Sequence, residues 1–179
     1  MISQAQMAKQ KRLFFRLIER VYRLSENAVM DCAGSCNGTC ETEMPETVLF
    51  LPYELEYIME GLGLEKNPFL EIQLPSGRYG MMDCENLCPF LVPPDCAIRP
   101  FRPFDCRSFP LFPHFPPSTS APLDFYVASY CPLKARLSPD YIESIVESWR
   151  ILAPHLPPDW KELYNSVCHY QEKFPLPKS

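Results

Sequence analysis

Nine cysteines offer the most distinctive chemistry in this 179-residue sequence. Cys32, Cys36 and Cys40 are each separated by three residues, with Gly34 and Gly38 in the gaps. Glycine permits positive φ angles and close backbone approach, so amide N–H groups can point at a thiolate or sulfide and soften its negative charge. The spacing therefore predicts a loop that wraps a single metal centre.

A second group of cysteines lies in the middle of the chain and is accompanied by arginines. Arg99, Arg102 and Arg107 stand close to these cysteines in the sequence. Nearby cations lower the pKa of a thiol and offset the negative charge of a thiolate-ligated cluster, so we predict that the three arginines lie beside the bound cofactor. An anion-binding site is the alternative for them. The predicted metal ligands are Cys32, Cys36, Cys40, Cys88, Cys96, Cys106 and Cys131, and Cys84 is a further candidate.

The number and spacing of the cysteines bear on which metal they bind. Disulfides are rare in reducing compartments, so metal ligation is the leading explanation for so many cysteines in an intracellular chain. Structural zinc sites usually show paired C-x2-C motifs and four ligands in total, whereas the spacings here are mixed and the thiols more numerous. We therefore expect an iron–sulfur cluster of the 4Fe-4S type, with zinc as the alternative. Cys168 falls on the apolar face of a predicted helix, where a thiol acts as a small hydrophobic group.

The middle of the chain resembles a known family of cysteine-rich proteins. Its motifs are Cys88-Pro-Phe-Leu, Cys96-Ala-Ile, Arg102-Pro and Cys106-Arg-Ser-Phe-Pro, in that order. They are similar to the C-x-x-L, C-x-I-Y, R-P and C-R-x-F-P series of the YkgJ-type cysteine-cluster proteins. That family is described as zinc- or iron-chelating domains, so the resemblance implies that this chain binds a metal.

The resemblance covers residues 32 to 131, and Cys131 is similar to a later cysteine of that family. The chain also departs from the family pattern. Its first three cysteines are spaced more widely than the family's C-x-x-C-x-x-C-C signature, and Arg99 stands where the family has tyrosine. Flagellin lysine methylases carry a related cysteine cluster, so the resemblance also implies a protein-modifying enzyme as a third hypothesis.

Helical patterns occupy both ends of the chain. Residues 9–25 place apolar side chains at the spacing of an amphipathic helix. Pro52 to Gly61 carries a similar, shorter pattern. In Ser138-Pro139-Asp140, the serine is an N-cap residue, the proline suits the first helical turn, and the helix dipole stabilises the aspartate. A second helix is predicted to start near Asp159. We therefore predict C-terminal helices over about 139–172.

The segment between these helices is predicted to form short strands and irregular structure. Phe69–Leu74 and Arg78–Asp83 flank Pro75-Ser76-Gly77, which indicates a hairpin, and Asp124–Tyr130 is typical of another strand. Ten prolines between Pro89 and Pro122 exclude regular helix there, because proline lacks the backbone donor. The same stretch is too apolar for a disordered linker, so metal ligation would supply its order.

Together these patterns predict an α+β fold, helix-rich with little strand, whose irregular proline-rich centre is organised by a cysteine-ligated metal site. The length is that of a single domain spanning residues 1–179. Within it we expect an N-terminal helix at about 9–25, a cysteine-cluster core at 31–132, and the C-terminal helices at about 139–172.

Charge and hydropathy narrow the classes of partner. A net charge of −5 gives no large positive field for a phosphate backbone, which argues against nucleic acid. No apolar run is long enough to cross a bilayer and no secretory signal is visible, so we expect a cytoplasmic protein with no membrane partner. We interpret the basic side chains of the first helix as a solvated face; they are Lys9, Lys11, Arg12, Arg16, Arg20 and Arg23.

The functional hypotheses follow from the metal. The first is an iron–sulfur protein whose cluster transfers electrons or presents an open iron to a substrate or partner, so that a redox or other protein partner is expected. The second is a zinc-stabilised interaction module whose aromatic residues in 109–117 dock a partner. No phosphate-binding loop or nucleophile elbow is present, and no catalytic residue can be singled out.

Overall fold

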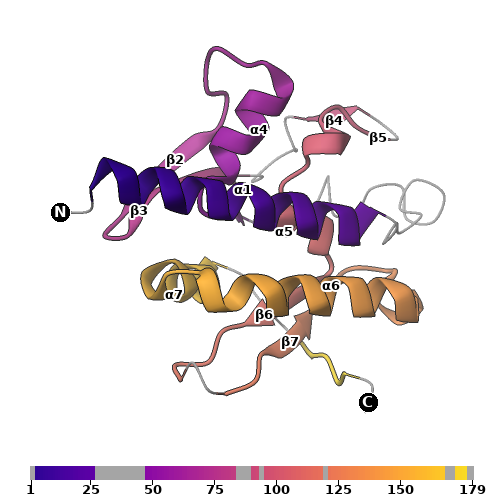
Figure 1. Ribbon diagram of the computed structural model, residues 1–179. Coiled ribbons are helices and arrows are strands. Elements are labelled where there is room, and N and C mark those ends of the chain that lie inside the picture. The colour runs from indigo at the N-terminus through magenta and orange to yellow at the C-terminus, as the bar shows by residue number, and fades with distance from the viewer. Residues whose placement is uncertain are drawn as a thin grey trace.

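The computed structural model describes residues 3–26, 47–83, 90–92, 95–118, 121–167 and 172–176. It is an α+β protein, as predicted. Figure 1 shows α1 (Gln4–Glu26) and α6 (Pro139–Leu152) lying across the centre, with α4 (Glu54–Leu62), β2 (Leu70–Leu74) and β3 (Gly77–Asp83) on one side and β6 (Leu111–His114) and β7 (Asp124–Val127) on the other. Within the described ranges, no helix is long and apolar enough to cross a membrane.

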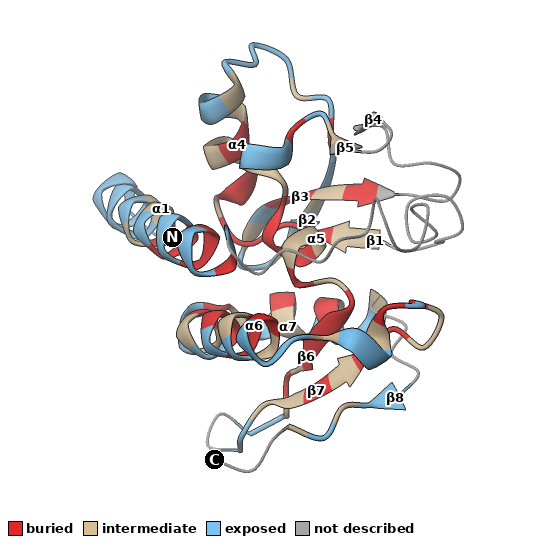
Figure 2. Cartoon of the chain, turned by 90° about the vertical axis from the view of Figure 1, so that its right-hand side faces the viewer, coloured by how far each residue is buried: buried red, intermediate tan, exposed pale blue. Residues whose placement is uncertain are grey.

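Helix α1 spans Gln4–Glu26 and confirms the predicted N-terminal helix, beginning earlier than expected. It starts at Ser3 because Ser3 and Gln6 cap each other: the Ser3 amide donates to Gln6 Oε1 at 2.9 Å, and the Gln6 amide donates to Ser3 Oγ at 3.2 Å. One face of the helix is buried, including Phe14, Ile18 and Val21. Figure 2 shows that face turned toward the interior, against α6 and α4.

The C-terminal helices are α6 at Pro139–Leu152 and α7 at Pro158–Val167. Ser138 caps α6 by accepting the Tyr141 amide at 3.1 Å, as its sequence predicted. The helical prediction to residue 172 was too long, because Glu172–Lys173 forms strand β8 beside β7. Cross-strand hydrogen bonds satisfy this backbone in place of a further helical turn.

The first sheet has strands β1 (Thr47–Leu49), β2 (Leu70–Leu74) and β3 (Gly77–Asp83) in the antiparallel order β1-β3-β2. The β2–β3 pair is the predicted hairpin. Between β1 and β2 lies α4 (Glu54–Leu62), which confirms the predicted short helix and ends at Gly63 with φ 64°. Glycine suits that left-handed position because it has no Cβ.

The proline-rich centre is more regular than the sequence indicated. The prediction that it contains no helix was wrong, because Phe104–Ser108 forms the one-turn helix α5. No proline lies within this turn, and Pro103 precedes it at a position where its missing N–H costs no helical hydrogen bond. The other elements are β4 (Leu91–Val92), β5 (Asp95–Cys96), η1 (Arg99–Phe101), β6 (Leu111–His114), β7 (Asp124–Val127), η2 (Lys134–Arg136) and η3 (Ala153–His155).

The largest apolar cluster joins α1, α6 and α7 to the centre of the chain. Trp149 is fully buried there, with its ring 4.9 Å from Phe104 and 5.4 Å from Tyr164. Trp160 stacks on Tyr164 at 5.0 Å. Aromatic pairs at these distances add to the free energy gained from burying their surface.

Two buried carboxylates fix the position of α5. Glu54 accepts hydrogen bonds from Tyr22 Oη at 2.8 Å and from the backbone amides of Leu51 and Phe104, both at 2.7 Å. Asp105 accepts from Tyr164 Oη at 2.6 Å and from the Leu49 amide at 3.3 Å. Helix α5 is thereby tied to α1, α4, α7 and β1.

The environment of Glu54 acts on its ionisation in two directions. Burial raises the pKa of Glu54, because the charged carboxylate has left water. The hydrogen bonds from Leu51, Phe104 and Tyr22 and the charge of Arg107 oppose that rise. Burial is the largest of these effects, so the pKa of Glu54 stays above its ordinary value.

Glu54→Gln is expected to lower the free energy of unfolding by about 1–3 kcal/mol, because one acceptor oxygen becomes an N–H group facing buried donors. Urea unfolding of both proteins measures this. Glu56→Gln on the same helix is the matched control and should change stability by less than about 0.5 kcal/mol. Equal losses in both variants would contradict the role of Glu54.

The raised pKa of Glu54 predicts how this contribution depends on pH. The folded protein keeps the proton to higher pH than the unfolded chain, whose Glu pKa is near 4.5, so the stabilisation is full below that value and is lost as pH rises through the folded pKa. The stability difference between the natural protein and Glu54→Gln should therefore shrink as pH rises above about 4.5. Urea titrations at several pH values test this, and a difference that widens with pH would contradict it.

Candidate functional site

Cys96 and Cys106 are brought to one part of the molecule by different elements. Cys96 ends β5 and pairs with Leu91 of β4, while Cys106 lies in the middle of α5. Both side chains are half-buried and pack against the same apolar cluster. The buried members of that cluster are Phe50, Leu55, Ile58, Phe69, Met82 and Ile98.

The first sheet brings the flanks of two further cysteine segments to the same neighbourhood. Thr47, at the start of β1, pairs with Asp83, at the end of β3. Residues 27–46 precede the first of these positions and residues 84–89 follow the second. Next to this pair, Met82 belongs to the apolar cluster that receives Cys96 and Cys106. The cysteine-bearing segments therefore join the described structure at one end of one sheet, beside the apolar cluster that receives Cys96 and Cys106.

The last turns of α1 lie at the same place. Burial raises the pKa of the Tyr22 hydroxyl, and the nearby Glu54 and Cys106 add to the rise. Residue 27, where the first cysteine segment begins, follows directly on Glu26 at the end of this helix. The described ranges therefore stop at Glu26, begin again at Thr47 and stop again at Asp83. The first of these positions follows Tyr22 on α1, and the other two form the end of the sheet.

Cys131 is placed elsewhere. Its side chain is buried and belongs to a separate apolar cluster with Phe112, Ala128 and Leu133. Its amide donates to the Ala128 carbonyl at 3.1 Å, which fixes a turn after β7. The structure therefore does not put Cys131 in the apolar cluster that holds Cys96 and Cys106, and its role as a ligand stays a prediction.

The other predicted ligands are not placed by the structure. In the ranges it describes, no three His, Cys, Asp or Glu side chains lie close enough together to hold a metal ion. The remaining cysteines, Cys32, Cys36, Cys40, Cys84, Cys88 and Cys168, lie outside the described residues.

Of the three predicted arginines, Arg107 is held by backbone carbonyls of η1 and the residue after it. Its Nε donates to the Arg102 carbonyl at 2.8 Å, and its Nη2 donates to the carbonyls of Pro100 at 2.8 Å and Arg99 at 3.3 Å. The guanidinium lies 3.8 Å from the centre of the Tyr22 ring, a cation–π contact. Burial lowers the pKa of Arg107, and the charges of Tyr22 and Glu54 oppose this shift.

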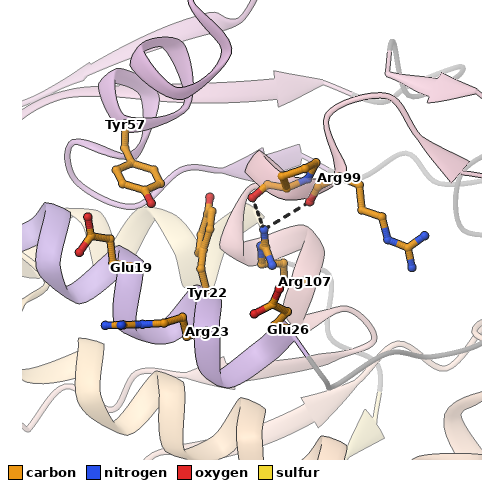
Figure 3. Close-up of a pocket in the computed structure, with 8 residues that line it drawn as sticks. Glu19, Tyr22, Arg23, Glu26, Tyr57, Arg99 and Arg107 are labelled. Atoms are coloured by element: carbon orange, nitrogen blue, oxygen red, sulfur yellow. Dashed lines mark hydrogen bonds between the residues drawn. The ribbon is translucent and has the colours of Figure 1, made fainter.

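A pocket of about 510 Å³ opens beside Arg107. Helix α1 lines it with Glu19, Tyr22, Arg23 and Glu26. Figure 3 shows Tyr57 reaching in from α4, and Arg107 with its two dashed bonds to the carbonyls of η1. The walls come from α1, α4, η1 and α5, so the site exists only in the folded protein.

The sequence interpretation missed the acidic and aromatic part of this pocket. Glu19 and Glu26 are seven residues apart, which places them on one face of α1 two turns apart. Tyr22 lies between them on the edge of the same face. This spacing was the available signal, but exposed glutamates on an amphipathic helix usually face only solvent.

Comparisons of this chain with protein-family models, curated proteins and solved structures found no match. The likeness to YkgJ-type proteins therefore rests on the sequence motifs alone and stays a prediction. The fold and the described site define an α+β protein in which Cys96 and Cys106 pack on one apolar cluster and Arg107 lines a pocket.

Arg107→Lys is expected to destabilise the protein by about 1–3 kcal/mol, because an ammonium cannot reproduce the planar fork that serves three carbonyls while stacking on Tyr22. Chemical denaturation measures the loss. Arg150→Lys, at an exposed position on α6, keeps the same chemical change away from the site and should be neutral. If both variants unfolded at the same denaturant concentration, the hydrogen bonds and the ring contact of Arg107 would make no net contribution to stability.

Proposed function

We propose that this protein binds an iron–sulfur cluster through cysteine thiolates and uses it in a redox role or to bind a substrate or partner. A 4Fe-4S cluster is the preferred form. Its ligands would come from Cys32, Cys36, Cys40, Cys88, Cys96, Cys106 and Cys131, with Cys84 as a further candidate. When bound, such a cluster supplies one-electron transfer or an iron with an open coordination position.

One observation carries the proposal. Cys96 and Cys106 pack against one apolar cluster, and Met82 of that cluster is adjacent to the Thr47–Asp83 pair. The segments with the other cysteines of the first and second groups are attached at this pair. An iron–sulfur cluster needs about four thiolates from different loops, and apolar surroundings help to exclude solvent from it.

The charge near Cys106 also favours a thiolate-rich cofactor. Arg107 follows Cys106 directly, and Arg102 is near enough to lower the pKa of Arg107 by like-charge repulsion. A cluster held by four thiolates carries net negative charge, which this concentration of guanidinium groups would offset. A cytoplasmic location, where thiols stay reduced, suits the same chemistry.

The test is anaerobic purification of the full chain, followed by a visible absorption spectrum and assays for iron, zinc and acid-labile sulfide. We expect a brown protein with about four iron and four sulfide per chain. A colourless protein with one zinc per chain would replace the proposal by the zinc-stabilised interaction module. A protein with neither metal would refute both.

Serine variants test the ligand assignment. Cys36→Ser, Cys96→Ser and Cys106→Ser should each lose most of the iron, because a hydroxyl is a much poorer ligand for iron than a thiolate. Cys168→Ser is the control and should keep the full metal content, since the helical pattern assigns this residue to an apolar face. Equal iron in all four variants would overturn the assignment.

A further inference from the structure

Strand β2 forms one edge of the first sheet. The sheet has the order β1-β3-β2, and among the described residues no strand pairs with the outer side of β2. The pairing of β2 with β3 runs without a bulge from Leu70 opposite Met81 to Leu74 opposite Gly77. Figure 1 shows this hairpin on the side of the molecule where α1 begins. A regular edge of this kind offers its unpaired backbone groups to another strand.

The register of the hairpin decides which backbone groups of β2 face outward. Leu74 and Gly77 close the two-residue turn Pro75-Ser76, so they form a hydrogen-bonded pair. Hydrogen-bonded and non-hydrogen-bonded pairs alternate along an antiparallel ladder. Glu71 and Gln73 therefore belong to the non-hydrogen-bonded pairs, and their backbone groups are directed away from β3.

A hydrogen bond between β3 and the chain after β1 agrees with this alternation. Gly80 lies opposite Glu71, yet its carbonyl accepts the amide of Phe50, the residue after β1, at 3.0 Å. That carbonyl is turned away from β2, as expected of a non-hydrogen-bonded pair. The amides and carbonyls of Glu71 and Gln73 consequently point to the outer edge of the sheet.

One face of β2 carries an apolar row that this chain covers only in part. Leu70, Ile72 and Leu74 share a face because side chains alternate along a strand. Ile72 and Leu74 are half-buried against the largest apolar cluster, whereas Leu70 is 53% exposed. Apolar surface therefore continues to the edge of the sheet, where a further strand would extend it.

The polar face of β2 carries no charge that would repel such a strand. Proteins often protect a sheet edge with a free charged side chain, a proline or a bulge. The charged side chain of β2 is Glu71, which accepts a hydrogen bond from Asn67 Nδ2 at 2.6 Å and pairs with Arg78 Nε at 3.0 Å. Gln73 is folded over the turn, because its Nε2 donates to the carbonyls of the two residues that close it, at 2.9 Å and 3.2 Å.

We propose that β2 pairs antiparallel with β2 of a second copy of this chain, about a two-fold axis at Ile72, so that the first sheets of both copies become continuous. In this register Glu71 lies opposite Gln73 of the second copy, and the reverse pair follows by symmetry. Each outward amide of these residues then donates to an outward carbonyl of the other copy. The interface includes none of the predicted metal ligands.

The sequence of β2 is self-complementary about this axis. Leu70 lies opposite Leu74 of the second copy, and Ile72 lies opposite its own equivalent in a non-hydrogen-bonded pair, where side chains approach most closely. The apolar row of each copy thereby continues into that of the other. Apolar pairs placed directly opposite each other stabilise neighbouring strands.

Neighbouring registers are less favourable. A two-fold axis at Glu71 would set two carboxylates opposite each other, which is destabilising. An axis at Gln73 would set Glu71 opposite Pro75, which has no amide hydrogen to donate. The axis at Ile72 instead sets each Glu71 carboxylate opposite a neutral amide side chain. The same edge chemistry therefore selects one register as well as one partner.

Sedimentation equilibrium of the full chain, as purified, tests the proposal. A pairing of one short strand is at the small end of specific interfaces, so we expect a reversible dimer with a Kd of about 10–100 µM. Samples from about 5 µM to 500 µM should pass from monomer to dimer. A monomer at every concentration would overturn the proposal.

Two substitutions at one position locate the interface. Gln73→Pro removes an outward amide and places a ring between the two copies, yet it takes no hydrogen bond from the pairing of β2 with β3. It should weaken the dimer at least about tenfold. Gln73→Ala keeps the amide and is the matched control, which should dimerise like the natural chain. Equal dimerisation of both variants would place the contact elsewhere and refute the assignment.

Amide hydrogen exchange of the natural chain gives a measurement that does not depend on how a variant folds. The amides of Glu71 and Gln73 should exchange more slowly at about 500 µM than at about 5 µM, because dimerisation gives each an acceptor. Exchange rates of these amides that stay the same while the chain dimerises would contradict the pairing through β2.

Discussion

The Glu54 carboxylate, fully buried and hydrogen-bonded by three donors, is the interaction on which the arrangement of this protein depends. Its donors come from α1, from the turn before α4, and from the first residue of α5. Removing a carboxylate from water is costly, and the three donors offset part of that cost. The requirement fixes three elements that are distant in sequence at one point, and α5 cannot shift without leaving the charge unsatisfied.

Helix α5 then distributes three consecutive side chains to three environments. Asp105 turns inward to Tyr164, Cys106 packs on the apolar cluster with Cys96, and Arg107 stacks on Tyr22 at the pocket. Successive residues of a helix point about 100° apart, so one turn suffices to separate them. The anchor, the thiol and the guanidinium are therefore positioned by one short element that the buried carboxylates hold in place.

In this arrangement Cys106 and the pocket beside Arg107 are neighbours. Cys106 and Arg107 are adjacent in sequence, and Tyr22 is within electrostatic reach of Cys106 while its ring supports Arg107. A change of charge at the thiol would therefore act on the wall of the pocket.

The sequence by itself determined the elements whose signals are local. Ser138 as a cap, the turn Pro75-Ser76-Gly77 and the apolar period of α1 depend on neighbouring residues only, and the structure confirms the elements that they predicted. Tertiary structure alone decided that Glu54 and Asp105 are buried, that Phe104–Ser108 forms a helix among prolines, and that Glu19 and Arg107 line one pocket. These features depend on partners more than thirty residues away, as with Tyr22 and Glu54, and burial and hydrogen bonding act through space rather than along the chain.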